Sequence, residues 1–280
     1  RTFEGLSGAY LQFAGRVEQY YRDQFGAESP QALGNFRGTH AEPKVNRLVL
    51  ENWLAEFPSI TTRTAHRLHS VHADPGSKRI VSLTFADDSG DEITIAATHF
   101  VDATYEGDLM AAAGCRFAVG RESESEYGES LAPAVGDDQL QGFNFRLVVT
   151  DDPENRQPIA RPQGYDRKQF LPVLDLIREG KIDKPFCFSS GDRKALFKAQ
   201  EPALPNRKFD VNDVSHGAVR LSLPGRNRRW PTGSPGDRRQ IWQIHYRHQL
   251  GLLYFAQNAP ELSGEFRADA QRFGLCRDEF

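Results

Sequence analysis

The segment from His99 to Gly114, with the sequence HFVDATYEGDLMAAAG, limits the possible folds more than any other part of the chain. Its first six residues, 99–104, have the pattern of a buried strand that enters a tight turn. The alanine-rich stretch from Asp108 predicts a short helix that ends at Gly114. Such a strand end lets a ligand approach the backbone closely and reach unpaired N–H groups at the helix start. Asp108 also fits a simple cap of that helix, and the residues alone leave both interpretations open.

Hydrophobic periodicity in the rest of the chain predicts a mixed α/β protein. Apolar residues at spacings of three and four predict the helices 6–25, 43–57 and 237–258, a helix after Asp166 and a short one that ends at 273. Apolar and β-branched segments predict the strands 59–66, 67–73, 79–86, 92–98 and one within 141–150. We expect 79–86 and 92–98 to pair as a hairpin. The ranges 27–41 and 183–235 show little periodicity and are predicted to be loops.

The composition excludes several classes of protein. Lys and Arg number 35 against 38 for Asp and Glu, so the chain has no basic field that would gather nucleic acid. No apolar run approaches the roughly 20 residues of a membrane span. The three cysteines, Cys115, Cys187 and Cys276, form no C-x-x-C pair, and we therefore predict neither a metal site nor a disulfide framework.

A family resemblance adds to this interpretation. Residues 102–114, DATYEGDLMAAAG, resemble the DATGDGD-x-A-x-x-AG signature of a bacterial family of FAD-dependent oxidoreductases. Blocks on both sides are similar to that family in the same order, from EGLSGAYLQFAGRVEQYY to GLLYFAQNAPELSGEFRADAQRFGLCRDEF. The resemblance implies a partial FAD/NAD(P)-binding fold of the glutathione-reductase type with a β-meander. Residues 1–118 would be the remaining part of the FAD-binding domain, and residues 119–280 an inserted mixed cap or substrate domain.

The resemblance also implies FAD as the cofactor and suggests which residues line it. Ala103, Thr104 and Gly107 would lie along FAD with Asp108 nearby, and the segment containing Arg67 and Leu68 would pass its adenine end; these candidates are Ala103, Thr104, Gly107, Asp108, Arg67 and Leu68. The family places a glycine-rich unit before the first helix and a closing segment after the last block, whereas this chain contains no G-x-G. We therefore expect a fragment of the full enzyme. Tyr105 and Glu106 stand where the family has Gly-Asp.

Four residues are candidates for orienting a substrate or moving a proton. His245 and His248 share one stripe of the predicted long helix, where they could bind a metal, donate to a substrate or simply be packed at a domain boundary. Arg146 is predicted in mid-strand, facing either a substrate carboxylate, the flavin ring or solvent. Asp210 belongs to the polar run 206–213, which fits a polar pocket or an ordinary turn.

The function implied by the resemblance is FAD-dependent oxidation or reduction of a small organic substrate. A second hypothesis is a non-catalytic or carbohydrate-active binding module in which Trp53, Trp230 and Trp242 stack on sugars. A third is a homologue that keeps the fold without the cofactor. We predict a soluble chain, cytoplasmic or exported after removal of an N-terminal segment, and the sequence does not indicate its oligomeric state.

Overall fold

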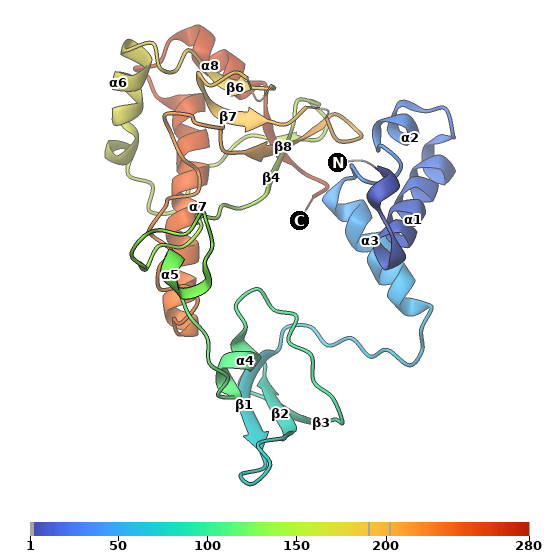
Figure 1. The fold of residues 1–280 in the computed structure, drawn as a ribbon. Helices are drawn as coiled ribbons and strands as arrows, with labels where there is room; N and C mark the ends of the chain where they lie inside the picture. The colour runs from blue at the N-terminus through green and yellow to red at the C-terminus, as the bar shows by residue number, and fades with distance from the viewer. Residues whose placement is uncertain (1–2, 190, 202, 280) are drawn as a thin grey trace. The chain divides into compact units, whose positions relative to one another are not determined.

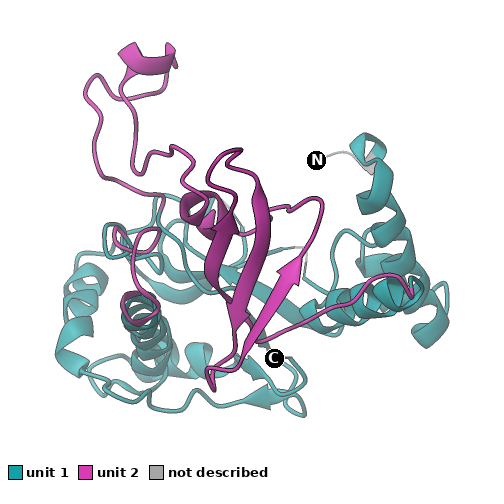
Figure 2. Ribbon diagram, turned by 90° about the horizontal axis from the view of Figure 1, so that it is seen from below, with its two compact units in different colours: residues 1–57, 142–227, 238–280 teal, residues 58–141, 228–237 magenta. Residues whose placement is uncertain are grey.

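The structure is a computed structural model, and it describes residues 3–189, 191–201 and 203–279. The chain divides into two compact units (Figure 2): unit 1 comprises residues 1–57, 142–227 and 238–280, and unit 2 comprises residues 58–141 and 228–237. Each unit contains helices and one β-sheet, so the predicted mixed α/β class is confirmed. The division predicted near residue 118 is a functional one, between a part that binds the cofactor and a part that binds the substrate. This assignment stays a prediction.

Three helices form the N-terminal part of unit 1 (Figure 1). After a 3₁₀ turn, η1 (Phe3–Gly5), come α1 (Gly8–Phe25), α2 (Pro30–Gly34) and α3 (Pro43–Ala55). Val17 of α1 and Val45 of α3 belong to one buried cluster, which confirms the two amphipathic helices predicted from spacing. The predicted loop 27–41 is wrong in part, because α2 lies within it. That helix begins where the Ser29 hydroxyl accepts a hydrogen bond from the backbone N–H of Ala32.

A six-stranded sheet forms the centre of the rest of unit 1. Its order is β5 (Arg156–Gln157), β9 (Gly274–Cys276), β4 (Leu147–Thr150), β8 (Lys208–Asn212), β7 (Ala195–Ala199) and β6 (Lys184–Cys187). All neighbours are antiparallel except β6 and β7, which are parallel. Three of these strands lie in the range 183–235, so the loop prediction there is wrong. β7 is buried at four of its five positions and therefore lacks the alternation by which strands are recognised.

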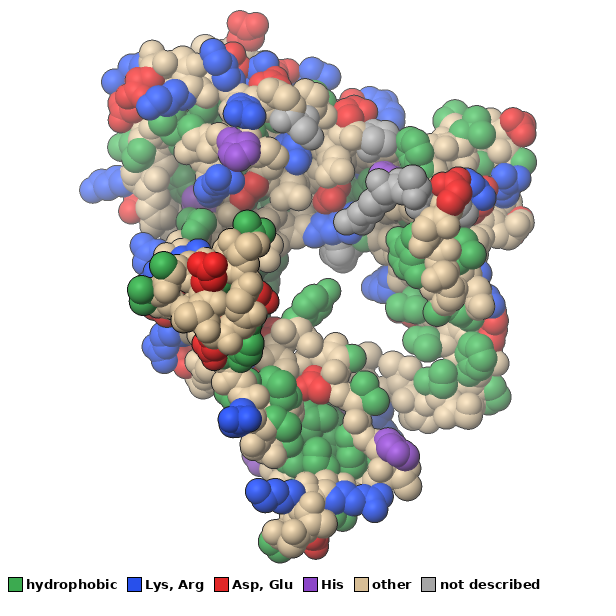
Figure 3. Space-filling view, in the orientation of Figure 1, with side chains coloured by type: hydrophobic (Ala, Val, Ile, Leu, Met, Phe, Trp, Pro, Cys, Tyr) green, Lys and Arg blue, Asp and Glu red, His purple; other side chains and the backbone are tan. Residues whose placement is uncertain are grey.

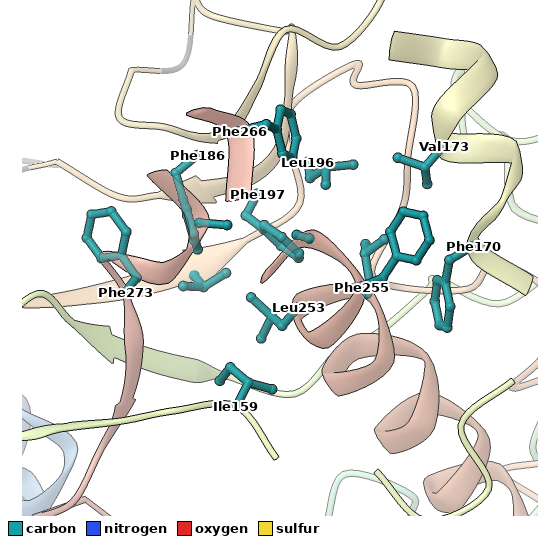
Figure 4. Close-up of a cluster of buried hydrophobic side chains, with 14 of the residues drawn as sticks. Ile159, Phe170, Val173, Phe186, Leu196, Phe197, Leu253, Phe255, Phe266 and Phe273 are labelled. Atoms are coloured by element: carbon teal, nitrogen blue, oxygen red, sulfur yellow. The ribbon is translucent and has the colours of Figure 1, made fainter. Parts of the chain in front are cut away.

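Helices pack on this sheet and enclose the main core. They are the 3₁₀ turn η2 (Arg167–Phe170), α6 (Pro172–Arg178), α7 (Pro235–Asn258) and α8 (Gly264–Gln271). Figure 4 shows Phe197 of β7 and Phe255 of α7 among the buried side chains, and both are fully buried. The predicted helices after Asp166, over 237–258 and before 273 are thus confirmed. No helix in the described ranges has the length and apolar character needed to cross a bilayer.

Unit 2 is built on an antiparallel β-meander, as the sequence predicted. β1 (Arg67–Ala73) pairs with β2 (Ile80–Ala86), which pairs with β3 (Glu92–Ala96). The short helices α4 (Asp108–Ala112) and α5 (Glu124–Tyr127) follow, and α4 contacts β1.

Two predicted strands of unit 2, 59–66 and 99–104, are wrong. Both ranges have extended or irregular backbone, and neither is paired with a strand of the described chain. A strand needs a neighbour to take up its backbone N–H and C=O groups. The apolar pattern of 99–104 does not lead to burial either, since the Val101 side chain is 84% exposed.

Candidate functional site

Asp102 organises the turn that leads into α4. One of its carboxylate oxygens accepts hydrogen bonds from the Thr104 N–H (3.0 Å) and hydroxyl (2.7 Å), and the other accepts one from the Met110 N–H (3.0 Å). The Thr104 hydroxyl in turn accepts a hydrogen bond from the Gly107 N–H (3.0 Å). The hydroxyl of Thr104 and the backbone N–H groups of Thr104 and Met110 lower the pKa of Asp102. Asp102 is not among the site residues predicted from the sequence, although it lies inside the segment that resembles the family signature.

The predicted cofactor residues of unit 2 come from two adjoining segments. Leu68 lies on β1, the strand that α4 contacts, while Ala103, Thr104 and Gly107 lie in the turn before α4. Ala103 and Thr104 are exposed. Gly107 has a left-handed backbone with φ of 70°, and Asp108 is the first residue of α4. The structure therefore brings the two predicted segments together within one unit.

Leu68 belongs to an apolar face of the meander. It pairs with Phe85, which pairs with Ile93, and cross-strand partners share a face of a sheet. Figure 3 shows hydrophobic side chains gathered over this part of unit 2, where Val81 and Ile95 are 43% and 41% exposed.

Arg67, the other predicted residue of β1, points its charge elsewhere. Its guanidinium forms an exposed ion pair with Asp88 at 2.7 Å. An exposed pair of this kind is weak, so Arg67 can exchange it for another anion at little cost.

These observations test whether the unit 2 residues fit FAD. Small exposed residues and an apolar sheet face fit a flat ring system. The N–H groups of Thr104, Gly107 and Met110 already have acceptors, so the turn fits close contact with FAD rather than binding of its phosphates.

His245 is held in unit 1 by one ring nitrogen, while the other has no hydrogen-bond partner in the described structure. It lies on α7, is 1% exposed and stacks on Phe143 with ring centroids 5.0 Å apart. Its Nδ1 is 2.9 Å from the carbonyl oxygen of Ile241, and a carbonyl only accepts, so Nδ1 carries the hydrogen. Nε2 is buried without a hydrogen-bond partner in the described structure. A buried lone pair without a donor is costly, which makes Nε2 a strong candidate for receiving a proton or a hydrogen bond.

His248, one helical turn further along, has the opposite tautomer. Its Nε2 donates to the carbonyl oxygen of Arg220 at 2.8 Å, which leaves Nδ1 as the acceptor. Burial lowers the pKa of His248, the Arg220 carbonyl partly opposes this, and nearby His245 lowers the pKa further. His248 is therefore neutral at pH 7, and its ring stacks on Phe170 at 6.0 Å.

Arg146 and Asp210 are brought together as an ion pair. The Arg146 Nε lies 3.3 Å from a carboxylate oxygen of Asp210, a residue of β8. The predicted mid-strand position of Arg146 is wrong, since it immediately precedes β4. Burial raises the pKa of Asp210, and the charge of Arg146 opposes that rise. The pair thus holds a partly buried carboxylate in place beside a half-exposed guanidinium.

A buried ionic cluster around Lys208 was missed by the sequence analysis. The Lys208 side chain is fully buried, and its Nζ lies 2.6 Å from Glu42, 2.7 Å from Glu279 and 2.8 Å from Asp278. The Glu42 contact is an ion pair without the alignment of a hydrogen bond. Burial opposes the charge of Lys208, but its carboxylate partners outweigh burial and raise its pKa.

This cluster bears on the prediction that there is no metal site. The oxygens of Glu42, Asp278 and Glu279 lie close enough together to hold a cation. The ammonium group of Lys208 already stands among them and supplies the positive charge. Because the three carboxylates are far apart in the sequence and no short motif links them, only the folded chain reveals the cluster.

The three tryptophans of the carbohydrate hypothesis each have a partner within their own unit. The guanidinium of Arg16 lies 5.0 Å from the centre of the Trp53 ring. Trp230 Nε1 donates to Glu106 at 2.9 Å, and Trp242 stacks on a tyrosine of α7 at 5.0 Å. These contacts give the hypothesis no support.

Comparison with known proteins decides the family. The family described as FAD dependent oxidoreductase matches residues 2–280. The chain belongs to this family. FAD is accordingly its cofactor and redox catalysis its general activity, as the resemblance implied. No curated protein and no solved structure matches the chain.

Proposed function

We propose that this family member oxidises or reduces a small organic molecule, with FAD in contact with the 102–110 turn and β1 of unit 2. The family match over residues 2–280 carries the proposal. When bound, FAD supplies the redox chemistry, and the protein supplies position, exclusion of water and a place for protons. Ala103, Thr104, Gly107 and Leu68 would provide the contact surface, since they are small or apolar and lie on adjoining segments.

His245 and His248 are the proposed proton-handling groups of unit 1. Both are fixed by a carbonyl acceptor on one nitrogen, so the other nitrogen of each ring is an acceptor. His245 Nε2 is the stronger base candidate because it is buried and has no hydrogen-bond partner in the described structure. The Arg146–Asp210 pair is proposed to orient a charged or polar group of the substrate.

Titration of FAD fluorescence with the 280-residue chain tests the flavin contact. Ala103→Trp places a large ring on the proposed contact surface, whereas Ala97→Trp places the same ring on an exposed loop of the same unit. We expect Ala103→Trp to weaken binding about tenfold or more through steric exclusion and Ala97→Trp to change it little. Equal affinities for the two variants would refute the proposed contact.

A further inference from the structure

A pocket of about 370 Å³ opens beside His248 in unit 1, between η2, α6, α7 and the loop 218–226. Its volume lies in the range of small-molecule sites. Phe170, Val173 and Leu252 form its deep wall and are 2%, 6% and 1% exposed. Such a wall holds an apolar body and excludes water from it.

The charged groups of this pocket are all cationic. Arg220 and Arg226 line it, and no Asp or Glu is among its lining residues. Within the described ranges neither guanidinium forms an ion pair. A guanidinium beside an apolar wall matches a carboxylate attached to an apolar body, because its fork of N–H donors binds both carboxylate oxygens.

His248 adds a second polar requirement. Its Nε2–H is committed to the Arg220 carbonyl, and its ring is fixed against Phe170, so Nδ1 is presented as an acceptor. Because Nδ1 of His248 accepts a hydrogen bond, it disfavours a ligand carboxylate beside it and favours a hydroxyl or N–H group of the ligand.

The wall itself depends on a glycine. A Cβ at Gly251 of α7 would lie 2.6 Å from Cζ of Phe170, so the ring reaches its place only because that side chain is absent.

We infer that this pocket binds a small hydrophobic carboxylate that carries a hydroxyl group, with the carboxylate at Arg226, the hydroxyl at His248 and the apolar body against Phe170 and Leu252. Binding requires only unit 1 residues. The identification of this ligand as the substrate class rests on the proposed function, whereas its binding does not.

Calorimetric titration of the 280-residue chain with four probes tests the assignment. The complete probe is the hydroxy acid 2-hydroxy-4-methylpentanoate. Its amide lacks the charge, 4-methylpentanoate lacks the hydroxyl group, and lactate lacks most of the apolar body. We expect the hydroxy acid to bind most tightly. The amide and the deoxy acid should each be weaker by about tenfold, the effect of one hydrogen bond, and lactate by about 50-fold, the effect of three buried carbons. An amide or lactate that binds as tightly as the hydroxy acid would overturn the assignment.

Matched variants locate the contacts. Arg226→Gln is expected to weaken the hydroxy acid about tenfold, while Arg239→Gln, an exposed position on α7 outside the pocket, leaves it within twofold. His248→Phe keeps the ring stacked and should abolish the preference for the hydroxy over the deoxy acid. Ala218→Trp, at the exposed rim, should block both acids. Identical affinities for the two arginine variants, or an unchanged hydroxyl preference in His248→Phe, would refute the pocket.

These outcomes are separable from the flavin proposal. Loss of FAD binding in Ala103→Trp with intact acid binding supports both proposals. Acid binding by a chain that shows no FAD contact supports the pocket and removes the claim that its ligand is the substrate.

Discussion

Replacing Lys208 by methionine removes a positive charge from a place that solvent does not reach. The Lys208 side chain is fully buried, and Glu42 and Glu279 beside it are 1% exposed. Methionine keeps a similar volume, so little of the expected effect comes from a cavity. What remains is two buried carboxylates that lose their buried counter-charge and keep only Lys44, which is one-third exposed and lies 3.5 Å from Glu42.

The magnitude follows from the distances. At an effective dielectric constant of about 20, an ion pair at 2.7 Å carries about 6 kcal/mol of Coulomb energy. Much of this is offset by the cost of removing the charges from water, and losing one partner of a buried pair costs about 3–5 kcal/mol. We expect a loss of this size in unit 1, because the cluster joins Glu42 at the start of α3 to β8 and to the residues after β9.

Hydrogen exchange measured by mass spectrometry reports the loss of stability separately for each segment of the chain. Peptides that cover α3 and β8 should exchange about 150- to 5,000-fold faster in Lys208→Met, which is the loss of about 3–5 kcal/mol expressed as a ratio of rates. Lys181→Met is the control, since Lys181 forms an exposed pair with Glu179 worth less than about 1 kcal/mol. Adding Glu42→Gln to Lys208→Met should restore part of the protection by removing one stranded charge. Equal exchange in the two single lysine variants would refute the reasoning.

Three further predictions concern stability and reactivity. Gly38→Ala should destabilise unit 1 far more than Gly26→Ala in urea unfolding: both glycines have positive φ, but only at Gly38 does a Cβ meet a carbonyl oxygen of α1, at 1.8 Å. Only Cys115 should react rapidly with a thiol reagent at pH 8, because burial raises the pKa of Cys276 to about 12. Burial alone would raise the pKa of Asp278, but its hydrogen bonds with neighbouring lysines and an asparagine lower that pKa far below the ordinary carboxyl value. Its stabilising effect is therefore present above about pH 4 and is lost progressively as the pH falls below that value, and Asp278→Asn should flatten this dependence.

Much of the fold was predictable wherever one face of an element is buried. α1 and α3 have apolar stripes, and the meander has the turn residues and alternation of a hairpin. β6 and β7 were not predicted from the sequence. Both of their faces are buried, so their residues show no alternation of apolar and polar side chains. The strand predicted at 99–104 failed for the opposite reason, since apolar residues alone do not provide a pairing partner.

The site was predictable only in its residue types. Spacing placed His245 and His248 on one face of a helix, and the structure confirms the helix. Which nitrogen of each ring is committed depends on carbonyls at Ile241 and Arg220, the second of which lies 28 residues away in the sequence. Geometry of this kind has no local signature, and the same holds for the charge cluster around Lys208.

The turn before α4 shows how the two interpretations of its sequence can hold at once. The sequence suggested two roles for Asp108, as the cap of α4 or as a residue close to a bound ligand, and one side chain cannot easily serve both. Here Asp102 takes the Met110 N–H in the first turn of α4 as well as the N–H of Thr104, so capping does not depend on Asp108. With three of its N–H groups satisfied internally, the turn keeps its shape without a ligand. A preformed turn loses little entropy on contact, and small exposed residues such as Ala103 let a flat ring approach. The proposed flavin contact therefore depends on shape at this turn and on N–H donors elsewhere.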